Sequence, residues 1–350
     1  YRGQGGKFYC ITTDLDQDKI EWIYQQVKRF GEEVPREMKL EIQLTISCGV
    51  AFFPQDAEDF ETLHANVEYA LEQAKKDGRG CIAQFSGKMH RRTVEQFRLQ
   101  EVLREAIANE FRGFSLVYQP LIRGEKQQVY GVETLMRFYL PDGSMVSPME
   151  FIPILEEDGT IHEVGEWLLN AALAQAALWR KENPDFVISV NVSYIQMLQP
   201  GFREMVTRIL EESQTSAQSL ILELTESCKV SDPNRLQDDF EYFKNLGIKM
   251  ALDDFGTEYS SIALLRKLKP QLIKIDHTFV RSIQDDEMDQ AILEYIMNLS
   301  KQTKIQVCVE GVENAEILAV VQSYQPELLQ GYYYSKPCPA AEFYEKYFDR

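Results

Sequence analysis

The chain has 350 residues, of which 44% are hydrophobic and 26% charged, so it has room for a globular barrel of about 250 residues and a smaller domain. The formal net charge of −18 repels polyanions, and we therefore expect no DNA or RNA polymer as a partner. No apolar run approaches the roughly 18 residues of a membrane span, so we expect membrane contact only through upstream regions that this sequence lacks.

The first residue is Tyr1 rather than Met, which suggests a fragment of a longer protein. The six cysteines show no CxxC spacing, which is typical of reduced thiols and predicts a cytoplasmic location for this fragment. The four histidines form neither an HxH nor an HExxH pattern, which argues against a zinc site.

Three elements are predicted in the first part of the chain. Residues 40–54 alternate apolar and polar side chains and predict a strand that leads into a turn. Residues 59–76 carry apolar side chains at helical spacing and precede Gly78, so they predict a helix. Residues 89–110 are polar with apolar positions at helical spacing. They predict a connecting helix that contains the domain boundary.

The second part repeats one theme. Short apolar runs end in a polar or acidic residue, and each is followed by a helical stretch, which predicts an α/β fold with a TIM-like (β/α)8 barrel. Extra helical sequence between the second and third runs covers residues 148–181. The predicted barrel strands are 116–121, 129–135, 186–191, 220–223, 249–253, 272–275, 306–310 and 328–330.

The ends of these strands carry the side chains of a candidate site. Barrel enzymes use the C-terminal ends of their strands, and oxygen donors without Cys or His favour Mg²⁺ or Mn²⁺. The pair Asp253–Asp254 favours two ions about 4 Å apart, the arrangement that displaces groups at phosphorus, with Lys274 as a fixed positive charge. The strand-end residues are Glu133, Asn191, Glu223, Asp253 and Glu310.

Each of these residues also has an ordinary structural explanation. A single strand-end Glu is more often a helix cap or an ion-pair partner than a ligand. Asp253 and Asp254 could cap the next helix, Lys274 could pair with Asp276, and Asn191 could be a turn residue. The functional interpretation is favoured because the residues occur together at matching positions of successive units.

The second part also resembles the EAL domain of bacterial cyclic di-GMP phosphodiesterases, over essentially all of residues 97–350. The resemblance implies hydrolysis of cyclic di-GMP to linear pGpG, two Mg²⁺ or Mn²⁺ ions, and a homodimer formed through this domain. It rests on the ordered motifs YQPLI (118–122), GVETLMRF (131–138), SPMEFIPILEEDGTI (147–161), SVNVS (189–193), LELTES (222–227), LDDFGTEYSS (252–261), LIKIDHTFV (272–280), VEGVE (309–313) and QGYYYSKPCP (330–339).

The resemblance also implies a role for each matching residue. The implied metal ligands are Glu133, Asn191, Glu223, Asp253 and Asp254, and the implied catalytic residues are Lys274, Glu310 and Glu133. The implied substrate contacts are Gln119, Leu135, Arg137, Pro153, Glu313 and Tyr332, and the implied supporting residues are Glu226, Asp276 and Gln330.

Two positions depart from the pattern of the family. Thr134 replaces the Ala of the Glu-Ala-Leu signature, and we expect a mild effect because Thr is close to Ala in bulk. Glu258 stands where the family has Gly, in a loop associated with metal binding and with dimer-coupled activation. A catalytically weak or inactive receptor for cyclic di-GMP is therefore the alternative to the enzyme.

The first part resembles the C-terminal part of a GGDEF diguanylate cyclase domain, through RGQGGKF (2–8), SCGVAFFP (47–54) and ALEQAKKDGRG (70–80). Gly6 and Lys7 replace the two signature carboxylates, and a lysine cannot replace a metal-binding carboxylate, so no cyclase activity is expected. The expected organisation is a degenerate GGDEF part at 1–88, a linker helix at 89–110 and an EAL barrel at 111–350.

Overall fold

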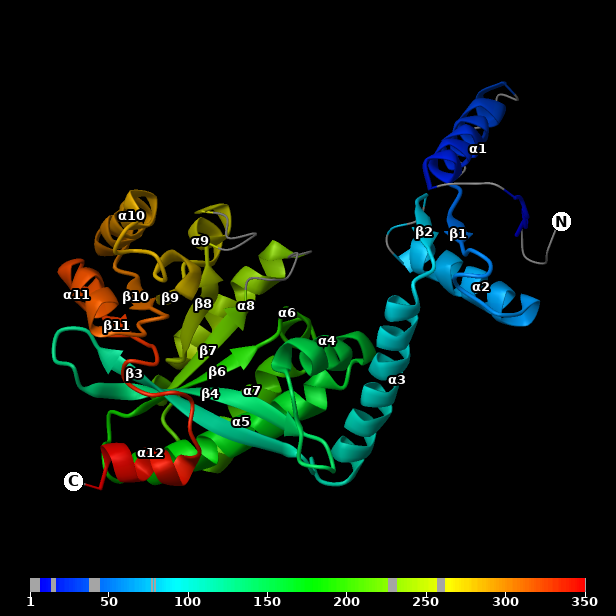
Figure 1. Ribbon diagram of the computed structural model, residues 1–350. Helices are drawn as coiled ribbons and strands as arrows, with labels where there is room; N and C mark the ends of the chain where they lie inside the picture. The colour runs from blue at the N-terminus through cyan, green and yellow to red at the C-terminus, as the bar shows by residue number, and fades with distance from the viewer. Residues whose placement is uncertain are drawn as a thin grey trace. The chain divides into compact units, whose positions relative to one another are not determined.

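The computed structural model describes residues 7–13, 17–37, 45–76, 78, 80–225, 232–256 and 262–349. The chain forms two compact units, Tyr1–Arg98 and Leu99–Arg350, which divide inside helix α3 (Gly87–Ala108) (Figure 1). Within the described ranges, every helix is too short or too polar to cross a membrane.

The first unit contains a pair of parallel strands next to a helix. Gly49 allows the close approach of this helix, because a Cβ added there would lie 2.3 Å from the backbone nitrogen of Leu71. The helix predicted at 59–76 is confirmed, whereas the described part of the strand predicted at 40–54 is shorter. The elements before α3 are α1 (Gln17–Glu37), β1 (Cys48–Val50), α2 (Phe60–Lys76) and β2 (Ile82–Gln84).

The second unit alternates strands and helices. Its strands are β3 (Phe114–Arg123), β4 (Val129–Tyr139), β5 (Met145–Val146), β6 (Val187–Val192), β7 (Leu220–Thr225), β8 (Lys249–Phe255), β9 (Leu272–Ile275), β10 (Gln306–Val309) and β11 (Leu328–Leu329). Its helices are α4 (Pro148–Asp158), α5 (Ile161–Trp179), α6 (Tyr194–Met197), α7 (Phe202–Ser213), η1 (Ala217–Ser219), α8 (Pro233–Leu246), α9 (Ile262–Leu268), η2 (His277–Phe279), α10 (Glu287–Thr303), α11 (Ala315–Ser323) and α12 (Ala340–Tyr347).

The strands close into the predicted barrel. They follow the order β3-β11-β10-β9-β8-β7-β6-β4, and a further pairing between β3 and β4 completes the ring. The short strand β5 pairs with β4 and lies outside the ring. The extra helical sequence at 148–181 forms α4 and α5.

The first strand departs from the simple repeat. β3 is antiparallel to both of its neighbours, β4 and β11, so the helix expected after this run is wrong. The turn at 124–128 is closed by a 2.8 Å hydrogen bond from the Arg123 nitrogen to the Gln128 oxygen. Such a turn suits a hairpin, because a parallel crossover needs a dozen or more residues.

A compact apolar cluster takes one residue from each strand of the ring. Side chains alternate between the two faces of a strand, so the next position on the same face lies two residues along the chain. The cluster therefore forms the floor on which the next layer of side chains rests. Its members are Leu121, Tyr130, Val187, Ile221, Ala251, Leu272, Cys308 and Leu328.

Helix α3 is divided between the two units. Its second half belongs to the second unit, where Leu103 is fully buried among Phe114, Phe138 and Phe151. The apolar residues of this half recur at helical spacing, which gives the helix one face to bury.

Candidate metal and phosphoryl-transfer site

A polar layer lies directly above the apolar floor of the barrel. Six of its members stand two residues further along the chain than the floor residue of their strand, with Glu310 and Gln330 just past the ends of β10 and β11. Gln119 stands two residues before Leu121 because β3 runs the other way. Glu133 stands three residues after Tyr130, next to a register shift between β3 and β4. The layer consists of Gln119, Glu133, Ser189, Glu223, Asp253, Lys274, Glu310 and Gln330.

Lys274 is the centre of this layer. Its side chain is only 1% exposed, and its ammonium nitrogen lies 3.0 Å from Glu133 Oε2 and 2.8 Å from Glu223 Oε2. The same nitrogen lies 2.7 Å from Glu310 Oε1 and 3.2 Å from Asp253 Oδ1. One ammonium group can compensate only one of these carboxylate charges, so the layer as a whole attracts further cations.

Glu133 is held on both of its oxygens. Asn191 donates a hydrogen bond from Nδ2 to Glu133 Oε1 over 2.7 Å, and Gln330 donates from Nε2 to Oε2 over 2.6 Å. Gln119, which is the strand partner of Glu133, accepts a second hydrogen bond from Gln330 at 3.0 Å. These contacts fix the carboxylate in one orientation before any ligand binds.

The two neighbouring aspartates reach the same space because the strand is irregular there. Adjacent residues of a regular strand point to opposite faces. The pairing of β8 with β9 shifts register between Leu252 and Phe255, and Asp254 has a left-handed backbone with φ of 53°. A bulge of this kind re-aims a side chain, so Asp253 and Asp254 can act together.

Burial changes the proton affinities of the carboxyl groups. Burial is the largest influence on each, and it raises the pKa of Glu223 to about 8 and that of Asp253 to about 6, against the lowering effect of Lys274. The pKa values of Glu310 and Asp254 are also raised, chiefly by burial. For Glu133 the charge of Lys274 and the hydrogen bonds outweigh burial, and the pKa is lowered.

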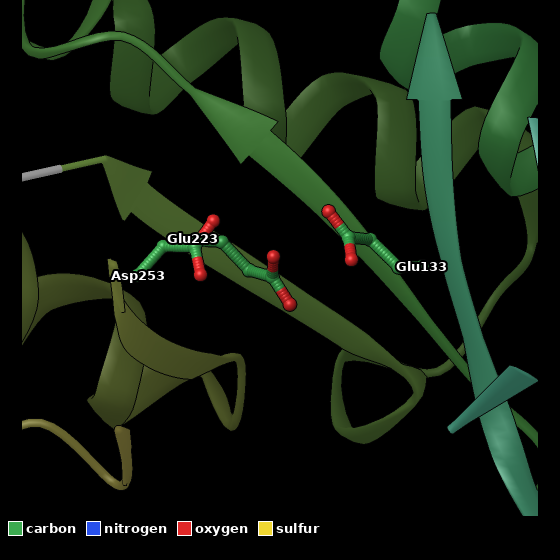
Figure 2. Close-up of side chains that lie close together, drawn as sticks. All are labelled: Glu133, Glu223 and Asp253. Atoms are coloured by element: carbon green, nitrogen blue, oxygen red, sulfur yellow. The ribbon is translucent and has the colours of Figure 1, made fainter. Parts of the chain in front are cut away.

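The donor set fits divalent metal ions. Two groups of three carboxylates, Glu133–Glu223–Asp253 and Asp253–Asp254–Glu310, each place ligand atoms within 4.8 Å of one another, and Asp253 belongs to both. Figure 2 shows the carboxylates of the first group turned toward a common space. Hard oxygen donors of this kind suit Mg²⁺ or Mn²⁺.

Two buried oxygen atoms support this fit. Asn191 Oδ1 has no hydrogen-bond partner among the described residues, although Asn191 Nδ2 donates a hydrogen bond to Glu133. Asp253 Oδ1 lies near Lys274 but outside hydrogen-bond geometry, so it also lacks a hydrogen-bond partner in the described part of the chain. A buried acceptor without a donor is costly, and a cation would satisfy it.

The predicted substrate contacts occupy different surroundings. Leu135 and Arg137 follow Glu133 at two-residue intervals on β4, on the same face of the strand, and both are half-buried. Pro153 and Glu313 are exposed, and so is Tyr332, whose side chain is 53% exposed with the Lys336 nitrogen 5.5 Å from the ring centre.

The predicted supporting residues are described only in part. Gln330 belongs to the polar layer. Asp276 caps η2 by accepting a 2.9 Å hydrogen bond from the Thr278 nitrogen and lies 2.8 Å from His277 Nδ1. Glu226 and Glu258 lie outside the described residues.

Three residues in or next to the site were not singled out from the sequence, namely Ser189, Ser193 and Glu156. Ser189 donates a hydrogen bond to Glu223 Oε1, and Ser193 donates one to Glu156 Oε1. Ser189 stands two residues before Asn191, so the two-residue period of a strand could have predicted that both side chains lie on the same face. The spacing of Ser193 and Gln196 was the signal for a helix cap.

Comparison with known proteins identifies the families that the two parts of the chain resemble. Residues 100–337 match the EAL domain, and residues 1–81 match the GGDEF domain of diguanylate cyclases. An uncharacterized signaling protein of Caulobacter vibrioides is 36% identical over 335 residues, which cover 96% of this chain and 40% of that protein.

A second relative carries a stated activity. The bifunctional diguanylate cyclase/cyclic di-GMP phosphodiesterase MucR of Pseudomonas aeruginosa is 32% identical over 303 residues, which cover 86% of this chain and 44% of that protein. A solved structure of the PaMucR phosphodiesterase in complex with c-di-GMP matches with a TM-score of 0.66 and 32% identity. The match covers 70% of this chain and 99% of that one.

This chain spans about two fifths of the length of these two curated relatives. Its match to the EAL domain covers more than half of its residues, and its barrel agrees with solved EAL structures. The chain therefore belongs to the EAL domain family, with a segment of the GGDEF type before the barrel.

Proposed function

We propose that this chain hydrolyses cyclic di-GMP to linear pGpG in bacterial second-messenger signalling, with two Mg²⁺ or Mn²⁺ ions. The proposal depends on one observation, the two carboxylate groups that share Asp253 around the buried Lys274. Relatives whose names state this phosphodiesterase activity support it.

The protein side chains have separate roles in this proposal. Divalent ions, when bound, neutralise phosphate charge and lower the pKa of water. Glu133, Asn191, Glu223, Asp253 and Asp254 hold them. Lys274 keeps a positive charge fixed where negative charge develops on the phosphate, because its carboxylate neighbours hold its pKa well above the usual range against burial.

Glu310 is proposed as the residue that takes the proton from the attacking water. Its carboxylate lies 2.7 Å from Lys274, and its side chain is 17% exposed, so it borders both the buried layer and the open side of the site. Burial raises the pKa of Glu310, and the Lys274 ammonium opposes this shift by favouring the ionised carboxylate that a base requires. Glu133 completes the catalytic set by fixing Lys274 from the other side.

The dinucleotide is proposed to bind along β4 and over the rim. Arg137 offers a guanidinium group that suits phosphate or a guanine edge. Tyr332 offers an exposed ring on which a guanine base can stack. Gln119, Leu135, Pro153 and Glu313 complete the proposed contacts, and Glu226, Asp276 and Gln330 support them.

The N-terminal part is proposed to be a degenerate GGDEF scaffold without cyclase activity. Lys7, at the position of a signature carboxylate, forms an ion pair with Glu68 of α2. We propose boundaries at 1–88, 89–110 and 111–350, a cytoplasmic location for this fragment and a homodimer through the EAL domain. DNA and RNA polymers are not proposed as partners, because the net charge is −18.

The alternative function is a receptor that binds cyclic di-GMP without cleaving it. The observation in its favour is Glu258, since the family has Gly at that position. A Glu258→Gly variant tests this alternative. A large gain in turnover would show that Glu258 restrains the enzyme, and equal turnover would show that it does not.

The test is incubation of the full chain with cyclic di-GMP and Mn²⁺, followed by chromatography of the products. We expect pGpG from the unmodified chain and none from Glu133→Ala. Glu157→Ala is the matched control, because Glu157 is exposed on α4. Tight binding of cyclic di-GMP without any product over hours would show that the chain acts as a receptor and not as an enzyme.

A further inference from the structure

The chain that leaves the site at Asn191 is fixed by a buried turn. Strand β6 ends at Val192, and Ser193 begins α6 by accepting a 3.3 Å hydrogen bond from the Ile195 nitrogen. Gln196 Oε1 accepts a 3.0 Å hydrogen bond from the Ser193 nitrogen in return. Both side chains are buried, so this reciprocal cap sets the direction of the chain after Asn191.

The same serine is also tied to a different element. Ser193 Oγ donates a hydrogen bond to Glu156 Oε1 in the last turn of α4. The hydroxyl thus serves two purposes at once, because its oxygen accepts from Ile195 while its proton goes to Glu156. The turn after β6 is therefore attached to α4 and does not depend on its own helix alone.

The last turn of α4 is itself tied to α3. Asp158, whose side chain is 4% exposed, accepts hydrogen bonds from Arg104 Nε at 3.1 Å and Gln100 Nε2 at 3.4 Å, both on α3. It also accepts a 3.0 Å hydrogen bond from the Thr160 nitrogen. Glu156 consequently extends from a turn that cannot shift freely.

Asn191 is the residue that this arrangement holds. It stands two residues before Ser193, its Nδ2 is engaged with Glu133, and its buried Oδ1 has no hydrogen-bond partner among the described residues. A single free acceptor can bind a cation only if its backbone keeps it at ligand distance. Groups that orient a ligand from behind commonly change metal affinity about 10–100-fold when they are removed.

We propose that Glu156 and Ser193 are positioning residues that hold Asn191 Oδ1 in place for a divalent ion. The proposal rests on the proposed function, because it assigns Asn191 to the same metal site. Neither residue touches the substrate or the reacting atoms; both act through the turn that follows Asn191.

The test compares variants of the full chain by Mn²⁺ titration, with calorimetry or the electron paramagnetic resonance of free Mn²⁺ as the readout. We expect Ser193→Ala and Glu156→Ala to bind Mn²⁺ about ten-fold more weakly. The double variant should be no weaker than the worse single one, because both changes remove the same hydrogen bond. Glu157→Ala, on the exposed neighbour, is the control.

Conservative variants separate positioning from a general loss of fold. Glu156→Gln keeps an acceptor oxygen for Ser193, and Ser193→Thr keeps the hydroxyl, so both should restore Mn²⁺ affinity to within about two-fold. Thermal unfolding with a chelator present reports the stability of each variant separately. Unchanged Mn²⁺ affinity in Ser193→Ala and Glu156→Ala, whatever their stability, would overturn the proposal.

The two proposals fail in different ways. If the unmodified chain binds Mn²⁺ but releases no pGpG, the proposed function fails while the titration still decides the role of Glu156 and Ser193. If pGpG forms and the two alanine variants bind Mn²⁺ normally, the function stands and the positioning role is wrong.

Discussion

The ammonium nitrogen of Lys274 lies 2.7 Å from a carboxylate oxygen of Glu310, deep in the mouth of a barrel. Glu223, Asp253 and Glu133 surround the same nitrogen within 3.2 Å. A buried cation in this position compensates carboxylates that would otherwise repel one another, and the charge that remains attracts metal ions. We therefore expect the behaviour of the site to depend on both the lysine and the proposed ions.

Replacement of Lys274 by Ala should destabilise the metal-free protein. We expect the free energy of unfolding to fall by about 3 kcal/mol at pH 8, because removing one partner leaves buried charges uncompensated. Mn²⁺ should restore part of this loss, and hydrolysis should fall at least about 100-fold. Urea unfolding with a chelator and with Mn²⁺ measures the effect, and Lys301→Ala, on an exposed lysine, is the control.

Replacement of Glu133 by Gln should separate binding from hydrolysis. The side chain keeps its shape but loses the charge that Lys274 and the proposed ions require. We expect product formation to fall about 100-fold or more, while cyclic di-GMP binding changes little. Glu150→Gln, on the exposed face of α4, is the control, and hydrolysis by Glu133→Gln at the unmodified rate would remove Glu133 from the catalytic set.

Metal affinity should rise with pH. Burial raises the pKa of Glu223 to about 8 and that of Asp253 to about 6, so Mn²⁺ must displace protons from these groups below those values. We expect affinity to increase about ten-fold per pH unit for each displaced proton between pH 6 and pH 8. Calorimetric titration measures it; an affinity that stays constant over this range would contradict the assignment.

The stability of the metal-free protein should fall as pH rises, in contrast to its metal affinity. Glu223 binds its proton more tightly in the folded state than at its ordinary pKa of 4.5, so between pH 4.5 and about 8 the folded state binds more protons than the unfolded state. Stability from this group is therefore lost as pH rises through that window. Chelator-treated protein should unfold at a higher urea concentration at pH 6 than at pH 8, and Glu223→Gln should reduce this difference.

Replacement of Tyr332 by Ala should weaken substrate binding without affecting the metals. The ring is 53% exposed, so little stability is lost with it. Stacking of one base contributes about 1–3 kcal/mol, and we expect the KM for cyclic di-GMP to rise on the order of ten-fold. Tyr333→Ala, on an exposed neighbouring ring, is the control, and an unchanged KM would exclude Tyr332 as a contact.

Much of the barrel could be predicted because short apolar runs, each ending in a polar or acidic residue, alternate with helical stretches. Glu223 and Asp253 lie on strands of the ring, and Glu310 follows its strand directly. The two-residue period of a strand also predicts that residues two apart share a face, as Ser189 and Asn191 do. The hairpin between β3 and β4 was missed because helical periodicity was assumed after every run, although the turn at 124–128 is too short for a crossover.

The sequence by itself determined which residue types stand at the ends of the strands, and hence that oxygen donors would gather at one rim. Only the tertiary structure decided how they meet: Lys274 and Glu133 are 141 residues apart along the chain, and local spacing cannot specify their 3.0 Å contact. The same holds for the backbone at Asp254, where an irregular pairing of β8 with β9 accompanies a left-handed φ of 53°. Chemistry was encoded locally, whereas geometry came from closing the ring.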